Sequence, residues 1–179
     1  MRWARTDCAL DQRCRQSHHS KILAMPDYPT ALATIRPARS EDIPRLVDLL
    51  IQGSLVDGKE DLLQLDQYQQ ALDEIRATPG CEVLAAEVDG VVVGVCQLIV
   101  FRHFQSEGGL CAEIESVHVH PEWRGRGIGG LLLESAVAQA AVFGCYRVQL
   151  TSNRKRHDAH RFYERHGFVK THEGFKLGL

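Results

Sequence analysis

The most informative stretch of the sequence is 117–130, which reads VHVHPEWRGRGIGG. A strand ends near its start, glycines alternate in its middle, and a helix with a nearly apolar interior begins at its end. Glycines let backbone N–H groups approach an anion closely, and a helix N-terminus adds partial positive charge. Arg124 and Arg126 add two full charges. The pattern therefore predicts a binding site for a diphosphate.

Two other phosphate-binding patterns fit this stretch less well. The spacing Gly125-x-Gly127-x-x-Gly130 satisfies the dinucleotide fingerprint, but that fold needs an acidic residue at the end of the next strand. Residues 149–153 read QLTSN and hold no acid, and the turn comes late in the chain, after an antiparallel meander. No Gly-Lys-Ser/Thr follows the glycines, which excludes the Walker pattern. A purely structural glycine turn stays open as an alternative.

The sequence on either side of this turn predicts one mixed α/β domain over residues 33–179. Hydrophobic periodicity and turn residues define its elements. In chain order they are a strand at 34–36, helices at 40–53 and 67–77, strands at 81–88, 91–104 and 112–119, a helix at 129–143, a strand at 147–150, a helix at 157–166 and two short strands within 168–179. Residues 1–32 show no sustained periodicity, and we interpret them as a disordered N-terminal leader.

Composition and charge argue against several classes of binding partner. The chain has 179 residues and a net charge of -2, so no overall positive field draws it to nucleic acid or to an anionic membrane. Its longest apolar run is too short to span a bilayer. Six cysteines are scattered without a C-x-x-C pair, which is typical of reduced cysteines rather than of a zinc site. We therefore expect a cytoplasmic protein without a metal and without nucleic-acid or membrane partners.

Two motifs together resemble the GCN5-related N-acetyltransferases, the GNAT superfamily. The cofactor motif of that family is Arg/Gln-x-x-Gly-x-Gly/Ala, matched here by Arg124, Gly127 and Gly129. Residues 161–168, RFYERHGF, are similar to its Phe-Tyr-x-x-x-Gly-Phe signature. The resemblance covers residues 33–179. It implies a small single-domain α/β protein with a mixed, mostly antiparallel, twisted sheet of about seven strands, flanking helices and splayed central strands that bind acetyl-CoA.

The resemblance also implies which residues hold acetyl-CoA, the co-substrate. In this family the pyrophosphate lies on the glycine turn, and the pantetheine arm runs along the strand before it. The last helix contributes through a Tyr and a preceding Asn; this chain has Arg156 where that Asn often stands, with Asn153 just upstream. The expected cofactor-binding residues are Val117, His118, Val119, Arg124, Gly125, Arg126, Gly127, Ile128, Gly129, Gly130, Asn153 and Tyr163.

Acetyl transfer to an amine needs a base, and two carboxylates are candidates. Glu113 and Glu115 stand two apart on a predicted strand and therefore face the same side, which regular alternation also assigns to Val117 and Val119. Paired, poorly solvated carboxylates have a raised pKa that suits proton abstraction near neutral pH. The resembled family has used both strand positions for its base. We expect Glu115 to be the base, with Glu113 as the alternative and a mere anchoring role open for each.

The leaving thiolate needs an acid, and Tyr163 is the candidate, because a phenol can donate a proton to it. A core tyrosine is its alternative role. Regular alternation places His118 and His120 on the strand face opposite the glutamates, and we interpret both side chains as structural or exposed.

The resemblance implies direct attack of a primary amine on acetyl-CoA in a ternary complex. The glutamate pair and the polar stretch 52–66 favour a small cationic acceptor. Residues 158–163, DAHRFY, resemble aminoalkylphosphonate acetyltransferases over too short a stretch to assign a substrate. The alternatives are a protein or peptide N-acetyltransferase, a non-catalytic acyl-CoA-binding sensor and a dinucleotide-dependent oxidoreductase. A homodimer is compatible with the family.

Overall fold

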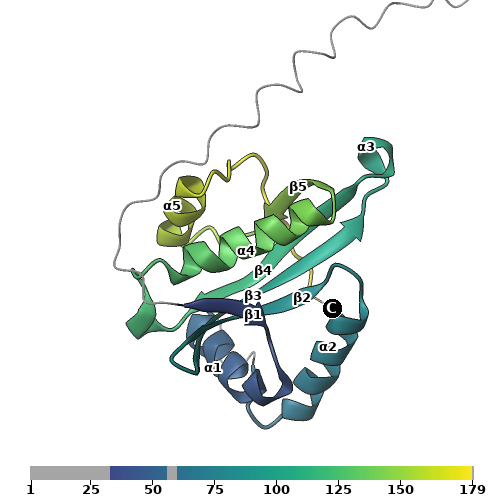
Figure 1. Ribbon diagram of the computed structural model, residues 1–179. Helices are drawn as coiled ribbons and strands as arrows, with labels where there is room; N and C mark the ends of the chain where they lie inside the picture. Colours follow the sequence, from purple (N-terminus) through teal and green to yellow (C-terminus); the bar gives the residue numbers. More distant parts are fainter. Residues whose placement is uncertain (1–32, 56–59, 179) are drawn as a thin grey trace, which may run out of the picture.

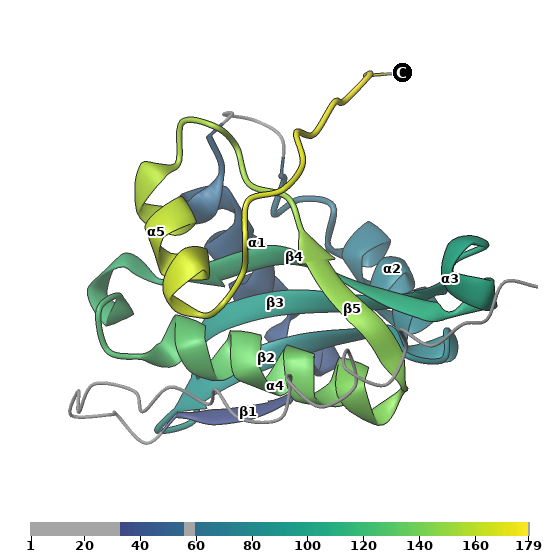
Figure 2. The same ribbon diagram turned by 90° about the horizontal axis from the view of Figure 1, so that it is seen from above.

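The computed structural model describes residues 33–55 and 60–178, which form one five-stranded sheet with helices on both faces (Figures 1 and 2). The strand order is β1-β2-β3-β4-β5, with every neighbouring pair antiparallel except β4 and β5, which are parallel. The strands are β1 (Thr34–Pro37), β2 (Glu82–Val88), β3 (Val91–Arg102), β4 (Leu110–Val119) and β5 (Cys145–Leu150). The helices are α1 (Ile43–Gly53), α2 (Leu65–Ala77), α3 (Gln105–Gly108), α4 (Ile128–Val142) and α5 (His157–Arg165).

The two faces of the sheet bury separate apolar cores. Helices α4 and α5 cover one face and α1 and α2 cover the other (Figure 1). On the first face Ile128, Leu132 and Leu133 of α4 are at most 1% exposed and pack on β2, β3 and β4. On the second face α1 supplies a stripe of leucine and valine side chains that packs on Val92 and Val95 of β3. The sheet therefore has two sides: the α4 side, which α4 and α5 cover, and the α1–α2 side, which α1 and α2 cover.

Most of the predicted elements are confirmed. The Asp89-Gly90 turn has positive φ at both residues, 49° and 80°, as a tight hairpin with the strand twist requires. Gly144 ends α4 at a φ of 76°, which is typical of the residue after a helix. The four cysteines in the described part of the chain are unpaired. The mixed, mostly antiparallel fold class is confirmed as well.

The predicted number of strands is wrong. The sheet has five strands rather than about seven, because residues 168–178 form no strand. This segment passes the end of β5, where Gly174 lies close to Thr151, and then runs away from the sheet (Figure 2). Two glycines and several charged residues fall in it, and its apolar side chains, such as Val169 and Phe175, are exposed, so no buried face fixes a strand register there.

The predicted side-chain pattern of β4 is also wrong, because the strand contains a β-bulge. Val95 of β3 pairs with His118 and Gln97 pairs with Glu115, so two residues of β4, Ser116 and Val117, stand opposite one residue of β3. Ser116 has a φ of 54°, the left-handed conformation that such irregularities use. The extra residue reverses the alternation for the rest of the strand.

The bulge changes which residues share a face. Val117 and Val119 pack into the core under α4, together with Ile114. The glutamates alternate with Ile114 and therefore lie on the α1–α2 side. His118 also lies on that side, where its ring touches Gly53 at the end of α1. Glu113, Glu115 and His118 thus share one face, contrary to the regular alternation assumed from the sequence.

The predicted leader, residues 1–32, lies outside the described residues. Among the described helices, none is both long and apolar enough to cross a membrane.

Candidate active site

The glycine turn forms an open cradle of backbone N–H groups at the start of α4. Gly125 and Gly127 have φ of 74° and 79°, a conformation that costs a side-chain-bearing residue about 1–2 kcal/mol. Gly127 is the N-cap of α4 and makes no side-chain capping hydrogen bond. Within the described chain, the N–H groups of residues 128–130 have no backbone or side-chain acceptor. Unpaired N–H groups at a helix N-terminus are the usual seat of a phosphate group.

The two arginines of the turn each make one contact with a neighbouring residue. Arg124 donates from Nε to the carbonyl oxygen of Val119 at 3.0 Å, which ties the turn to the end of β4. The Arg126 guanidinium lies over the Trp123 ring, 4.8 Å from its centroid. Both side chains are exposed. Their remaining N–H groups face solvent, where an anion seated on the turn would meet them.

Beside the turn, β4 has an edge that β5 does not cover. The parallel ladder between β4 and β5 runs from Leu110↔Cys145 to Ile114↔Leu150, whereas β4 continues to Val119. The chain then leaves β5 for α5, so the two strands separate at the bulge. An extended ligand can add to a strand edge through main-chain hydrogen bonds, and the uncovered edge leads directly to the glycine cradle.

The two glutamates occupy different surroundings on the α1–α2 side. Glu115 stands opposite Gln97 of β3, next to the bulge. Glu113 stands opposite Ile99 and lies beside Gln149 of β5, whose Nε2 is 3.4 Å from its Oε2. Glu115 is therefore at the point where β4 and β5 part, and Glu113 lies where they are still paired.

Tyr163 joins the α4 side of the site from α5. Its ring packs at edge-on angles against Phe162 and Phe168, with centroids 5.2 and 6.1 Å away. Burial raises the pKa of Tyr163; the charge of Arg156 opposes this rise, and the carboxylate of Glu115 adds to it. The phenol therefore stays protonated at neutral pH, and it lies within electrostatic reach of Glu115.

His118 and Arg156 both lie at the end of α1, next to Gly53, an arrangement that the sequence did not predict. Arg156 precedes α5 and donates from Nη2 to the carbonyl oxygen of Gly53, so it links α5 to the end of α1. Burial, followed by the charges of Arg156 and Arg124, lowers the pKa of His118 to about 4, against a smaller opposing effect of Glu60. Only the bulge brings His118 to this side, and no local sequence pattern marks a bulge at a serine.

Asn153, another predicted cofactor residue, lies in the turn between β5 and α5. It is exposed, and its Oδ1 accepts a hydrogen bond from the N–H of Lys155 at 2.9 Å. Its carbonyl oxygen is also bonded, to the N–H of Arg156 and to Nε2 of His160. These contacts shape the turn before α5. The structure does not bring Asn153 into contact with the glycine cradle.

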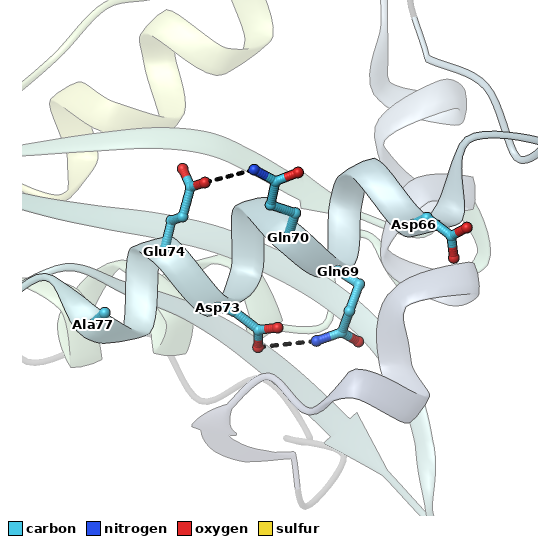
Figure 3. Close-up of a pocket in the computed structure, with 6 residues that line it drawn as sticks. All are labelled: Asp66, Gln69, Gln70, Asp73, Glu74 and Ala77. Carbon is cyan, nitrogen blue, oxygen red and sulfur yellow. Dashed lines mark hydrogen bonds between the residues drawn. The ribbon is translucent and has the colours of Figure 1, made fainter.

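A hollow on the described surface lies apart from the residues of this site. Its volume is about 560 Å³, and all six lining residues belong to α2 (Figure 3). Asp73 and Glu74 there accept hydrogen bonds from Gln69 and Gln70, one turn earlier on the same helix. A hollow with one helix as its only wall encloses no ligand, so we assign it no role. In the described residues no group of three or more histidine, cysteine or carboxylate side chains could hold a metal ion.

The comparisons with known proteins agree with this geometry. The sequence profile of the Acetyltransferase (GNAT) family matches residues 46–168, which include both glutamates, the glycine turn and Tyr163. The chain belongs to this family. Members of the family transfer acetyl groups from acetyl-CoA, so the chain is an N-acetyltransferase of the GNAT fold.

The acetyltransferase is similar to two proteins named for their acceptors. It is 37% identical over 115 residues to the aminoalkylphosphonate N-acetyltransferase of Salmonella typhimurium, covering 63% of this chain and 74% of that protein. It is 34% identical over 98 residues to the glucosamine 6-phosphate N-acetyltransferase of Trypanosoma brucei brucei, covering 55% and 65%. Among solved structures, a Bacillus halodurans protein described as a transcriptional regulator has a TM-score of 0.78 and 34% identity, covering 82% of this chain and 99% of that one.

Proposed function

We propose that the acetyltransferase moves the acetyl group of acetyl-CoA to the primary amine of a small molecule, by direct attack in a ternary complex. One observation carries this proposal: the open N–H cradle at the start of α4 lies at the end of the β4 edge that β5 leaves uncovered. A diphosphate and the extended arm attached to it need these two features side by side.

The residues of the cradle and the strand edge fit acetyl-CoA. Backbone N–H groups of residues 125–130 would hold the pyrophosphate, with Arg124 and Arg126 adding charge at its rim. The backbone of residues 117–119 would bind the pantetheine arm. Tyr163 would border the pantetheine arm from α5. Asn153 would contribute indirectly, by ordering the turn before α5. Acetyl-CoA supplies an acetyl group activated as a thioester.

The chain's own residues then handle two protons. Glu115 accepts a proton from the attacking amine, directly or through a water molecule, while nitrogen bonds to the acetyl carbon. Tyr163 donates its proton to the sulfur as the carbon–sulfur bond breaks. The products are an acetamide and the free thiol of coenzyme A. Support for these roles comes from the position of Glu115 at the parting of β4 and β5 and from the raised pKa of Tyr163; Glu113 is the alternative base.

The printed activities of the two similar enzymes favour a small acceptor, since both act on small amines. We extend this to the present enzyme and place it in the cytoplasm, where acetyl-CoA and reduced cysteines occur together. A protein or peptide acceptor is the second candidate, and a homodimer is compatible with either.

The test measures binding and turnover separately. Acetyl-CoA should raise the melting temperature of the protein, and NAD should not. A screen of small amines and peptides for release of coenzyme A thiol should then give turnover with a small amine. Binding of acetyl-CoA without thiol release from any amine would make the chain a sensor, and no binding would overturn the proposal.

A further inference from the structure

A groove lies between α2 and the sheet on the side that carries the glutamates. Its volume is about 300 Å³, and its walls come from two elements that face each other across it. The lining residues are Ala71, Glu74, Ile75 and Thr78 from α2, Cys81 before β2, and Gln97 and Ile99 from β3.

The strand register places this groove next to the proposed base. Gln97 is the direct partner of Glu115, and Ile99 is the direct partner of Glu113. Residues directly opposite each other in an antiparallel pair present their side chains to the same face, with Cβ atoms roughly 5 Å apart. A molecule whose amine lies at Glu115 would therefore extend its other end past Gln97 into the groove.

The lining combines apolar side chains with one carboxylate, that of Glu74. Ala71, Ile75 and Ile99 offer hydrocarbon surface, which packs against methylene groups. Glu74 offers a carboxylate whose one side-chain partner in the described chain is the neutral Nε2 of Gln70, at 2.9 Å. No lysine or arginine lines the groove. Arg76 of the same helix donates to the carbonyl oxygen of Ala38 and lies 3.8 Å from a carboxylate oxygen of Asp73.

We propose that this groove binds the non-reacting end of the acceptor, and that the acceptor is an aliphatic amine with a second cationic group, of the diamine class. The proposal rests on the proposed function, since it names the substrate class of that site. It differs from the phosphorylated or phosphonylated amines in the names of the two similar enzymes, because an anionic end would meet Glu74, Glu113 and Glu115.

Four acceptors with a similar stem test this class. Turnover by the full chain with acetyl-CoA is measured with butylamine, putrescine, γ-aminobutyrate and aminopropylphosphonate. The kcat/KM for putrescine should exceed that for butylamine by about fivefold, the size of one partly exposed charge pair, and the two anionic acceptors should be poorest. A preference for either anionic acceptor overturns the inference but leaves the proposed function standing. Failure of all four overturns the inference, and a missing thermal shift with acetyl-CoA would show that the proposed function fails too.

Two variants on α2 test where the second cationic group of the acceptor binds. Glu74→Gln removes the charge that lines the groove, and Asp73→Asn removes the same charge from the next position of α2, which lines the neighbouring hollow but not the groove (Figure 3). The ratio of kcat/KM for putrescine to that for butylamine should fall about fivefold in Glu74→Gln and stay unchanged in Asp73→Asn. Equal ratios in both variants would overturn the role of the groove.

Discussion

At the scale of single residues, Tyr163 combines an apolar setting with two charged neighbours. Its ring packs between Phe162 and Phe168, and the opposing effects of Arg156 and Glu115 act on its phenol. The net result is a raised pKa, so the group is a proton donor over the whole neutral range.

Replacing Tyr163 by Phe should therefore affect chemistry and not binding. The ring and its packing remain, while the proton is lost, so kcat should fall about 100-fold and the Kd for acetyl-CoA should stay within about twofold. Tyr146→Phe, on β5 where the hydroxyl bonds His103, is the matched control and should leave kcat unchanged. Full activity in Tyr163→Phe would show that the phenol is not the acid.

The two glutamates make a second residue-scale prediction, because Glu115 lies next to the bulge and Glu113 lies beside Gln149. Glu115→Gln should lower kcat/KM about 100-fold and remove the rising limb of its pH profile, since the amide cannot accept the proton. Glu113→Gln keeps its contact with Gln149 and should lower kcat/KM less, with the limb retained. A large loss in Glu113→Gln together with a small loss in Glu115→Gln would assign the base to Glu113. Small, equal losses of kcat/KM in both variants would show that neither glutamate is the base.

At the scale of elements, the two ends of α4 share a backbone conformation but not a function. Gly127 and Gly144 have φ of 79° and 76° at the N-terminus and the C-terminus of the helix. Alanine at either position should cost about 1–2 kcal/mol of folding free energy. Only Gly127→Ala crowds the N–H cradle, so its Kd for acetyl-CoA should rise at least about tenfold while that of Gly144→Ala should not change.

Thermal unfolding and isothermal titration of the two glycine variants check this prediction. Similar losses of stability with different losses of affinity are expected. If both variants bind acetyl-CoA like the wild type, the glycine turn is structural, and the cofactor lies elsewhere.

The elements and the cradle were predictable from sequence because their signals are local. Alternating glycines, a hairpin dipeptide and helical periodicity each depend on neighbouring residues only. The face of His118 was not predictable, since one left-handed serine reverses the alternation of β4 and only the pairing with β3 reveals it. The groove was missed for a related reason: Ile99 and Glu74 meet through tertiary packing, which spacing along the chain does not encode.

At the scale of the whole molecule, the titration of His118 makes the stability of the fold depend on pH. Its ring lies against the end of α1, close to the arginine that links α1 to α5. The pKa of about 4 in the folded chain lies below the 6.5 of an ordinary histidine. As the pH falls below 6.5, the unfolded chain binds a proton that the folded chain does not, so stability is lost between pH 6.5 and 4.

The expected loss is roughly 2 kcal/mol, discounted for partial solvent screening. His118→Phe cannot titrate and should lose less stability between pH 7 and pH 5 than the wild type, in chemical unfolding at each pH. His172→Ala, at an exposed histidine of the C-terminal segment, should behave like the wild type. An NMR titration that gives His118 a pKa near 6.5 would contradict the prediction.

The bulge in β4 makes the geometry of the site depend on the number of residues between Glu115 and the glycine turn. A chain without Ser116 would still send the two carboxylates and the imidazole to one side and the two valines to the other, so its packing should survive. The strand would then pair with β3 residue for residue, because Ser116 and Val117 now stand opposite a single β3 residue, and the local bend and added twist of the bulge would disappear. The strand edge proposed to hold the pantetheine arm would therefore change direction, and a misplacement of about 1 Å can already cost 100-fold in rate. Such a deletion should therefore produce a folded protein that no longer turns over.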